Sequence, residues 1–334
     1  MSGVTKQRVL SGMRPTGKLH LGHLVGALQN WVDLQAKYDS YHCVVDWHAL
    51  TTNYADTSEI VANGLDNVAD WIGSGLDPEK STFFVQSLVP EHAELYLLFQ
   101  MITPIPWLER VPTYKEQLEQ LSERDLSSIG FLGYPLLQAA DIVVYDAHWV
   151  PVGEDQVPHI ELTREVVRRF NNFYPDAALV EPQALLTPTP RLPGLDNRKM
   201  SKSYNNTIDL SDDARTVQNK VRQMYTDPKR VRADIPGTVE GNPVFMYHDA
   251  FNPDTAEVDD LKARYRAGKV GDVEVKTKLA AAVNNLLDPI RERRAQALAR
   301  PGYLRDVLIE GSKKARVVAQ ATMERVRGAV KLKY

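Results

Sequence analysis

The sequence predicts an α/β fold, in which a parallel sheet with flanking helices is followed by a smaller all-helical region. Three short apolar segments, residues 7–12, 41–45 and 81–86, are typical of buried strands and are followed by residues that end strands. The segments between them have helical periodicity, which gives a β-α-β-α-β order. Because this order is typical of crossover connections, we expect a parallel sheet with helices on both faces. After residue 211 only helical periodicity is clear.

The first two helices are predicted from the spacing of their apolar residues. The helix between the first and second strands carries such residues at near-helical spacing: Leu21, Leu24, Val25, Leu28, Val32 and Leu34. Before the third strand, Asp56 and Glu59 suit an N-cap and its N3 partner, ahead of an apolar run that starts at Ile60. Two crossover helices are therefore expected.

The middle of the chain combines an insertion with further helices. Residues 104–130 hold three prolines and a long polar run, which indicates a mobile or functional insertion within the first domain. Helical periodicity returns over residues 134–144 and 161–170. The Pro-rich residues 187–194 are typical of a boundary segment.

The C-terminal half is predicted to be helical. Asp212 and Asp213 suit the first turn of a helix, because acidic side chains are favoured there. Periodic segments follow at residues 214–224, 275–287, 290–299 and 303–326. We therefore expect three parts: an α/β domain over residues 1–205, a helical domain over residues 206–300, and a basic helix over residues 301–334 that packs back toward the first domain.

Composition and charge exclude some classes of protein. With 334 residues, 43% of them hydrophobic, the chain can bury a large core. It contains no apolar run of about 18 residues, the length that a membrane-spanning helix needs. No secretory signal is evident, so we expect a cytoplasmic protein. The single cysteine, Cys43, excludes an internal disulfide. Residues 291–334 hold 12 Lys and Arg but four Asp and Glu, which suits either a solvated helical face or contact with nucleic acid.

A turn after the first strand has the residues of a phosphate site. Residues 12–18 match the first seven positions of a P-loop, but Leu19 stands where a P-loop needs Ser or Thr for Mg²⁺. The following His20-Leu-Gly-His23 offers a second way to bind phosphate. Gly22 lets a nucleotide approach the backbone, and two imidazoles can donate hydrogen bonds to an oxyanion. Two histidines that merely cap a helix would leave the same short pattern.

The segment Lys199-Met-Ser-Lys-Ser203 strengthens the phosphate interpretation. It places two ammonium groups and small hydroxyl residues in one loop, which is the chemistry of a clamp on a polyphosphate leaving group. Alone, such a string would also suit a solvated basic loop. Together with the upstream histidine turn, it indicates two halves of one ATP site.

These motifs resemble those of the class I aminoacyl-tRNA synthetases, and more narrowly those of bacterial tryptophanyl enzymes. The resemblance runs collinearly from about residue 7 to the C-terminus. It is carried by Ser11-Gly-Met-Arg-Pro-Thr-Gly, His20-Leu-Gly-His23, Tyr134-Pro-Leu-Leu-Gln-Ala-Ala-Asp141, Val150-Pro-Val-Gly-Glu-Asp-Gln156, His159-Ile-Glu-Leu-Thr-Arg164 and the lysine loop. It implies a Rossmann-type catalytic domain, an α-helical anticodon-binding domain, a homodimer, and ligation of L-tryptophan to tRNA(Trp).

The implied reaction assigns roles to particular residues. The amino-acid carboxylate attacks the α-phosphate of ATP, so no general base is required, and positioning and charge neutralisation dominate, with Mg²⁺ on the phosphates. The catalytic residues implied are His20, His23, Lys199, Lys202 and, on the insertion, Lys115. Contacts to ATP are implied for Arg14, Pro15, Thr16, Gly22, His23, Gly153, Glu154, Asp155, Leu192, Lys199, Met200, Ser201, Lys202 and Ser203. Contacts to the amino acid are implied for Asp141, Tyr134, Gln138, Gln156, Gly12 and His48.

Selection of the amino acid is assigned to the helix predicted over residues 134–144. Tyr134, Gln138 and Asp141 share one face at i, i+4 and i+7. A buried carboxylate needs a partner, and an indole N–H or a phenol O–H would serve. The Gly-Glu-Asp-Gln segment and the His-Ile-Glu-Leu-Thr-Arg segment resemble the tryptophanyl pattern, although many of those enzymes have Met at position 138 and Gln at position 14. Some relatives hold an iron-sulphur cluster, which Cys43 alone cannot bind.

Three other functions are considered. A tyrosine–tRNA ligase would share the arrangement of Tyr, Gln and Asp on the selecting helix. A synthetase-like paralogue that binds RNA or protein without catalysis commonly loses a signature histidine or lysine, and a nucleotidylyltransferase lacks the lysine loop. For the ligase, we expect salt-dependent RNA affinity from the basic tail and from Lys220, Arg222, Lys229, Arg230 and Arg232.

Overall fold

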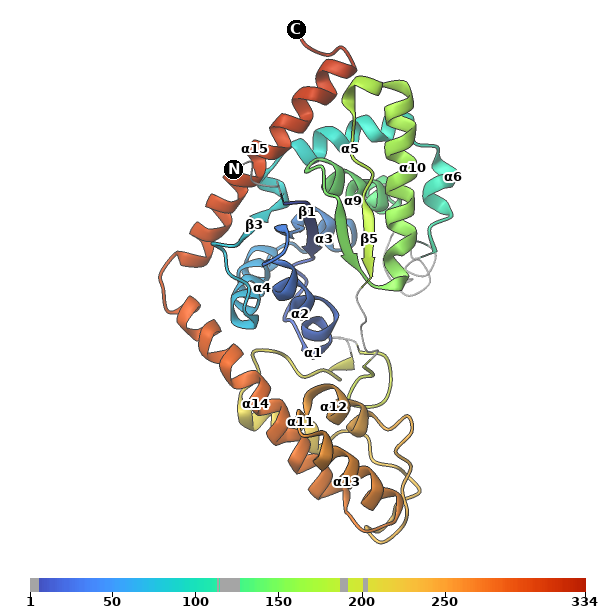
Figure 1. The fold of residues 1–334 in the computed structure, drawn as a ribbon, viewed down its shortest axis with the longest axis vertical. Coiled ribbons are helices and arrows are strands. Elements are labelled where there is room, and N and C mark those ends of the chain that lie inside the picture. The colour runs from blue at the N-terminus through green and yellow to red at the C-terminus, as the bar shows by residue number, and fades with distance from the viewer. Residues whose placement is uncertain (1–5, 113, 115–126, 187–191, 201–203) are drawn as a thin grey trace.

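The computed structural model describes residues 6–112, 114, 127–186, 192–200 and 204–334. Among these residues, five parallel strands form one sheet in the order β3-β2-β1-β4-β5 (Figure 1). The strands are β1 (Arg8–Met13), β2 (Asp39–Val44), β3 (Ser81–Val85), β4 (Trp149–Val152) and β5 (Gln183–Leu186). Helices flank this Rossmann-like sheet, so the predicted α/β fold is confirmed.

The chain starts at the centre of the sheet and builds it outward in two directions. β2 and β3 are added on one side of β1, and β4 and β5 on the other. β1 pairs with β2 along its whole length but with β4 only at Val9↔Trp149. The sheet therefore opens between the carboxyl ends of β1 and β4, and a switch of this kind is where doubly wound sheets bind ligands.

The first three strands lie within two residues of their predicted bounds, whereas β4 and β5 were not predicted. Both have four residues, and Pro151 within β4 argues against a central strand because proline cannot donate to the ladder. Pro151 is tolerated because it lies beyond the single residue at which β4 pairs with β1.

The first half of the chain contains the helices and helical turns that surround the sheet. Residues 21–34, predicted as one helix, include a π-helical turn, which is a rare element. The elements are α1 (Leu21–His23), η1 (Leu24–Leu28), α2 (Gln29–Leu34), α3 (Asp46–Asn53), α4 (Ile60–Ser74), η2 (Gln86–Leu88), α5 (Glu91–Ile102), α6 (Ile105–Glu109), α8 (Ile129–Leu132), α9 (Tyr134–Val143), η3 (Glu154–Gln156), α10 (Val157–Phe173) and η4 (Pro175–Ala177).

Two predicted helix caps differ from the structure. Asp56 accepts hydrogen bonds from the N–H and hydroxyl of Ser58, and the N-cap position of α4 is Glu59, whose side chain makes no cap bond. The expected capping pair is therefore wrong, because Asp56 forms a local turn instead. Asp213 is the N-cap of α11 and accepts from the Thr216 N–H at 2.6 Å, rather than lying in the first turn.

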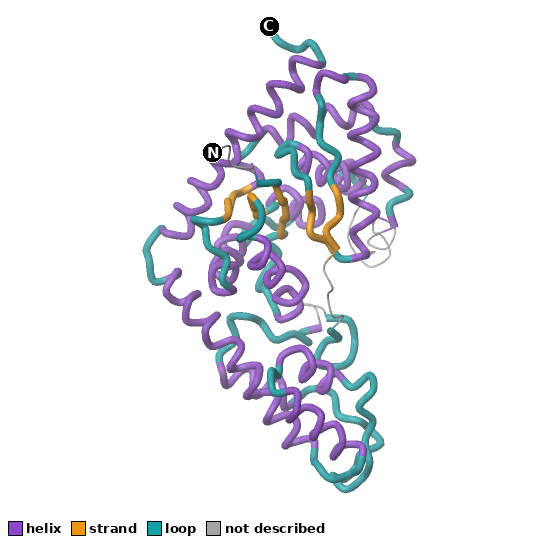
Figure 2. The backbone as a smooth tube through the Cα atoms, viewed as in Figure 1, coloured by secondary structure: helices purple, strands orange, loops and turns teal. Residues whose placement is uncertain are grey.

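The second half of the described chain is helical apart from its loops (Figure 2). Its helices are α11 (Ala214–Arg222), α12 (Pro243–Phe251), α13 (Thr255–Arg266), α14 (Asp272–Leu298) and α15 (Tyr303–Ala329). α14 was predicted as two helices separated at Pro289, but it is continuous through that residue. Leu287 and Ile290, on either side of the proline, are both buried, and this packing offsets the hydrogen bond that proline removes.

The two faces of the sheet pack into two hydrophobic cores. Successive strand residues point to opposite faces, so Phe83 contributes to one core and Phe84 to the other. The core containing Phe83 extends through α4 into helices α11 to α14, whereas the core containing Phe84 holds α5, α9 and α10. Each fully buried side chain of this size contributes roughly 1.5–3 kcal/mol. The helical region thus shares a core with the sheet domain.

α14 and α15 lie against the sheet domain, and Figure 1 shows α15 running alongside β3. A Cβ on Gly73 of α4 would lie 2.8 Å from the carbonyl oxygen of Ile290, so glycine allows α14 to approach closely. Gly311 likewise lets α15 approach the backbone of Phe83, and the Ser312 hydroxyl accepts the Val85 N–H at 3.1 Å. α15 therefore covers the edge strand of the sheet.

Candidate active site

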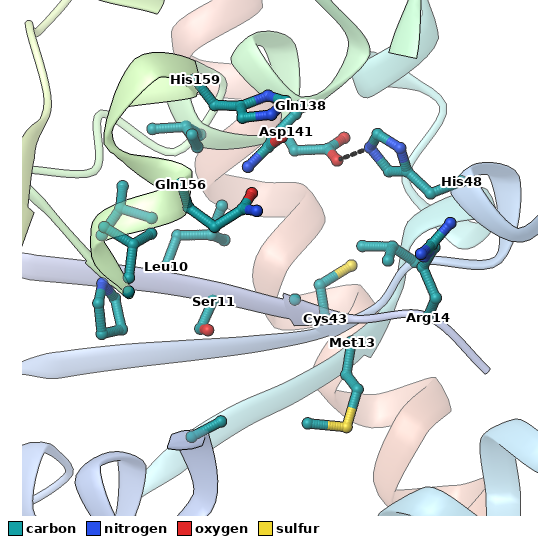
Figure 3. Close-up of a pocket in the computed structure, with 18 of the residues that line it drawn as sticks. Leu10, Ser11, Met13, Arg14, Cys43, His48, Gln138, Asp141, Gln156 and His159 are labelled. Atoms are coloured by element: carbon teal, nitrogen blue, oxygen red, sulfur yellow. Dashed lines mark hydrogen bonds and ion pairs between the residues drawn. The ribbon is translucent and has the colours of Figure 1, made fainter. Parts of the chain in front are cut away.

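A cavity of about 420 Å³ lies at the carboxyl ends of β1 and β4 (Figure 3). Its lining comes from β1 and the turn after it, from α9, and from β4 with the η3 turn that follows. All six residues expected to contact the amino acid line it: Gly12, His48, Tyr134, Gln138, Asp141 and Gln156. Figure 3 shows Gln138, Asp141 and His48 across the cavity from Ser11 of β1. The volume suits a small-molecule ligand.

Asp141 is the central polar group of this cavity. It is 4% exposed. The carboxylate accepts hydrogen bonds from His48 Nε2 (2.9 Å), from His92 Nδ1 (2.6 Å) and from the Gln86 amide (2.7 and 2.9 Å). Burial by itself would raise the pKa of Asp141, but the charges and hydrogen bonds of His92 and His48 lower it to about 2. Asp141 is therefore an ionised acceptor at neutral pH.

The remainder of the cavity wall is largely apolar. It includes Leu10, Trp31, Val45, Ile142, Val150 and Val152. His159 packs its ring against that of Tyr134, with centroids 5.6 Å apart, and burial lowers its pKa to about 4. The cavity is thus suited to a flat apolar group that carries one N–H or O–H donor for Asp141.

The histidine turn is fixed by its own backbone. The Gly22 N–H donates to His20 Nδ1, and the His20 N–H donates to His23 Nδ1, each at 3.1 Å. Because both Nδ1 atoms accept, the proton of each neutral ring is on Nε2. The two rings lie 3.9 Å apart, so one turn carries two imidazoles side by side. His23 also lines the cavity.

The lysine segment lies against this turn, although the two are far apart in sequence. A Cβ on Gly22 would be 2.9 Å from the sulphur of Met200 and 2.9 Å from His20 Cε1, so glycine is needed for this approach. Lys199 is exposed, and its carbonyl accepts from the Asn206 amide at 3.1 Å. The structure thus brings the two motifs together at Gly22 and Met200.

The other residues expected at ATP lie around the same opening. Arg14, Pro15 and Thr16 form the turn after β1, Gly153 follows β4, and Glu154 and Asp155 are exposed in η3. Arg14 and Gly153 line the cavity, whereas Pro15 and Thr16 border a neighbouring groove next to α3. Leu192 packs on the core that contains Phe83. Ser201, Lys202, Ser203 and Lys115, with residues 115–126 of the insertion, lie outside the described residues.

No metal cage is found in the part of the chain that the structure describes, where no three His, Cys, Asp or Glu side chains are grouped to hold an ion. Among those same residues, no helix is long and apolar enough to cross a membrane.

One of the cations expected to contact RNA is buried. The Arg230 side chain is 0% exposed, donates to the carbonyls of Ala233, Ile235 and Val270, and pairs with Asp272 at 3.2 Å. The expectation for Arg230 is therefore wrong, because its guanidinium closes a loop within the protein. Lys220 is also engaged, at 2.6 Å from Asp212, whereas Arg222, Lys229 and Arg232 are exposed.

Part of the basic C-terminal charge also has an internal role. Arg316 of α15 donates to Glu91 at 3.0 Å, Arg325 donates to Asp146 at 2.8 Å, and Arg327 donates to Glu94 at 2.7 Å. These contacts attach α15 to the sheet domain. They account for three of the basic residues without any contact to nucleic acid.

The residues behind Asp141 were not predicted from the sequence. Gln86 follows β3, His92 lies in the first turn of α5, and Tyr145 follows α9. No short motif links them, since each comes from a different element and they meet only in the folded chain. The single available signal was that each polar residue lies next to an apolar segment.

Comparisons with known proteins agree with this geometry. The family described as "tRNA synthetases class I (W and Y)" matches residues 4–288. The tryptophan–tRNA ligase of Thermotoga maritima is 51% identical over 328 residues, covering 98% of this chain and 100% of that protein. The corresponding enzyme of Treponema pallidum is 50% identical, covering 97% of each.

A solved structure gives the same result. The tryptophanyl-tRNA synthetase of Campylobacter jejuni, complexed with ADP and tryptophan, has a TM-score of 0.86 and 33% identity, covering 97% of this chain and 100% of that one. The tyrosyl-tRNA synthetase of Archaeoglobus fulgidus, complexed with L-tyrosine, has a TM-score of 0.66 and 26% identity, covering 86% and 90%. The likeness is greater to the tryptophanyl structure.

Proposed function

We propose, from the premise that this chain belongs to the class I tRNA synthetases of the tryptophan and tyrosine family, that it is a tryptophan–tRNA ligase. It activates L-tryptophan with ATP, forming tryptophanyl-adenylate and pyrophosphate. It then transfers the tryptophanyl group to the 3′-terminal adenosine of tRNA(Trp), releasing AMP. The observation that carries this proposal is the apolar cavity with the buried carboxylate of Asp141, which opens beside the histidine turn.

Asp141 selects the side chain of the amino acid. A flat indole fits between the apolar walls, and its single N–H is a donor suited to an ionised, buried acceptor. Phenylalanine would leave Asp141 without that donor, and sites built around such a hydrogen bond reject the analogue that lacks it by about 10⁴–10⁵. Tyr134, Gln138, Gln156, Gly12 and His48 position the rest of the amino acid.

The activation step needs positioning rather than proton transfer. An oxygen of the tryptophan carboxylate forms a bond to the α-phosphorus of ATP, while the bond from that phosphorus to the bridging oxygen breaks and pyrophosphate leaves. His20 and His23 donate through Nε2 to the phosphate oxygens, and their Nδ1 contacts hold the rings in place. Lys199, with Lys202 and Lys115, neutralises charge on the leaving group.

Mg²⁺ would be brought by ATP and held by its phosphates. This fits the described residues, which offer no preformed cage. The metal ion would neutralise phosphate charge. Arg14, Pro15, Thr16 and Gly22 border the nucleotide, together with Gly153, Glu154, Asp155, Leu192 and the segment from Lys199 to Ser203.

The partners follow from the same function. Residues 206–300 bind the anticodon of the tRNA, and the protein acts in the cytoplasm.

A second copy of this chain covers the apolar side chains exposed on α5 and the following helices, since patches of this kind mark interfaces. These include Leu97 (51% exposed), Met101 (71%), Ile105 (59%) and Ile129 (77%). We expect a dimer by sedimentation, and M101E should shift it toward the monomer; a monomeric wild type would contradict this interface.

Amino-acid-dependent exchange of labelled pyrophosphate into ATP tests the function. The purified protein should support exchange with tryptophan and not with tyrosine or phenylalanine. Exchange driven by tyrosine would make the chain a tyrosine–tRNA ligase. No exchange with any amino acid would favour a non-catalytic, synthetase-like protein.

A further inference from the structure

Asp141 is held mainly from behind the cavity. Of its three donors, His48 also lines the cavity, whereas Gln86 and His92 are 0% exposed and lie outside its lining. The side-chain oxygen of Gln86, Oε1, in turn accepts hydrogen bonds from the backbone N–H groups of Trp47 (3.1 Å) and His48 (3.4 Å). The amide of Gln86 is therefore oriented, with its N–H group toward the carboxylate.

His92 continues this arrangement to a second buried residue. A carboxylate can only accept, so the His92 nitrogen facing Asp141, Nδ1, carries a proton. On the other side of the ring, Nε2 lies 2.6 Å from the hydroxyl of Tyr145. Tyr145 is 0% exposed, and burial raises the pKa of its phenol, which therefore stays protonated at neutral pH. Tyr145, His92 and Asp141 thus form a continuous chain of buried hydrogen bonds.

We propose that His92 and Tyr145 are positioning residues that aim the Asp141 carboxylate at the N–H of the substrate and so determine selectivity for an indole. The Tyr145 hydroxyl fixes the rotation of the His92 ring, and His92 fixes Asp141 Oδ1. Neither residue contacts the substrate. This inference rests on the proposed function, and it assigns the selectivity of that site to residues behind it.

The structure explains why rotation of the carboxylate matters. Oδ1 accepts hydrogen bonds from His92 and Gln86. Oδ2 accepts one from the same Gln86 amide and one from His48, which lines the cavity. Without the bond from His92, the carboxylate can rotate about its terminal torsion, which is soft in aspartate. A rotated carboxylate would lose the hydrogen bond to the indole but would leave the apolar walls unchanged. Discrimination for the N–H should fall, while binding of the ring system should persist.

The test compares tryptophan with β-(benzothiophen-3-yl)alanine, which has sulphur in place of the indole N–H. The ratio of their kcat/KM values in pyrophosphate exchange measures the contribution of that hydrogen bond. We expect Tyr145→Phe and His92→Leu each to lower the ratio by about tenfold or more, consistent with one misdirected hydrogen bond. The KM for ATP should stay within about twofold. His92→Asn, which keeps an N–H near the position of Nδ1, should retain most of the ratio.

Tyr41→Phe is the matched control, because Tyr41 stacks on Tyr145 with centroids 5.4 Å apart and its hydroxyl bonds to Arg8 instead. Its ratio should equal that of the wild type. Variants that lose activity equally toward both amino acids, with the ratio unchanged, would overturn the positioning role. His92→Leu and Tyr145→Phe act on the chain through different atoms, so either alone decides if the other fails to fold. Absence of tryptophan-dependent exchange in the wild type would instead overturn the proposed function, and this inference with it.

Discussion

The two ends of the site are held in different ways. At the amino-acid end, Asp141 is 4% exposed and side chains from three other elements donate to it. At the phosphate end, the rings of His20 and His23 are half-buried and are fixed by backbone N–H groups of their own turn, while the exposed Lys199 lies on a segment from far along the chain. The difference suits the ligands, because a selective site must be rigid and dry, whereas a polyphosphate must enter, react and leave.

The largest effect is expected at the amino-acid end. Asp141→Asn removes the charge to which His48, His92 and Gln86 donate and turns half of the acceptor into a donor. Breaking a buried, charged network costs about 3–5 kcal/mol, so kcat/KM for tryptophan should fall about 10³-fold. The KM for ATP should change little. Pyrophosphate exchange at varied tryptophan and varied ATP measures both, with the exposed Asp176→Asn as the control; an equal rise in both KM values would show that the two ends are not separable.

The next effect is expected at the phosphate end. Lys199→Ala removes an exposed cation next to the histidine turn and should slow tryptophan activation by about 10²-fold, the usual loss for one group that stabilises developing charge. The Kd for tryptophan, measured by calorimetry, should stay the same. Arg198→Ala is the matched control, since that side chain pairs with Asp196. Loss of tryptophan affinity in Lys199→Ala would contradict the separation.

A smaller effect is expected where the lysine segment meets the turn. Gly22→Ala introduces a Cβ 2.9 Å from both His20 Cε1 and the Met200 sulphur, so one of them must move. Overpacking of this kind costs about 1–3 kcal/mol, and the KM for ATP should rise about tenfold while the KM for tryptophan is unchanged. Gly328→Ala, whose nearest neighbour would be 3.7 Å away, is the control. Wild-type kinetics in Gly22→Ala would show that this contact does not matter for ATP.

Asp141 and His42 should affect the pH dependence of stability in different pH ranges, because Asp141 has hydrogen-bond partners and the buried ring of His42 has none in the part of the chain that the structure describes. Neither ring nitrogen of His42 has a hydrogen-bond partner among the described residues, and burial lowers its pKa to about 3. The unfolded chain takes up this proton near pH 6.5, so the free energy of unfolding should fall as the pH drops from about 6.5 toward 3, by up to about 1.4 kcal/mol per unit. Asp141, with its pKa lowered to about 2, loses its contribution only below about 4.

Comparison of wild type with His42→Phe isolates the histidine from other titrating groups. Asp70, for example, acts in the opposite direction, because burial raises its pKa to about 7 and its contribution falls as the pH rises from about 4 to 7. Denaturant unfolding at pH 7 and pH 4.5 should show the variant gaining stability relative to wild type at the lower pH. Parallel profiles would contradict the assignment to His42.

The two ends also differ in how well they could be predicted. The histidine turn and the lysine segment are short motifs, and the i, i+4, i+7 spacing places Tyr134, Gln138 and Asp141 on one face without any structure. The network behind Asp141 could not be predicted, because Gln86, His92 and Tyr145 meet only through the packing of separate elements. Among elements of the fold, strongly apolar or periodic segments were predicted, whereas β4 and β5 were missed because they are short and β4 contains Pro151. Charge counts were the poorest guide to the residues that contact RNA, because Arg230, Arg316 and Arg325 form contacts within the protein.

The most direct test of Asp141 as the selecting group is a crystal structure of the chain with L-tryptophan bound. The indole nitrogen should lie about 2.7–3.2 Å from a carboxylate oxygen of Asp141, with the ring between the apolar walls of the cavity and His92 still bonded to the other oxygen. An indole nitrogen directed at another acceptor, or a ring bound outside this cavity, would contradict the assignment.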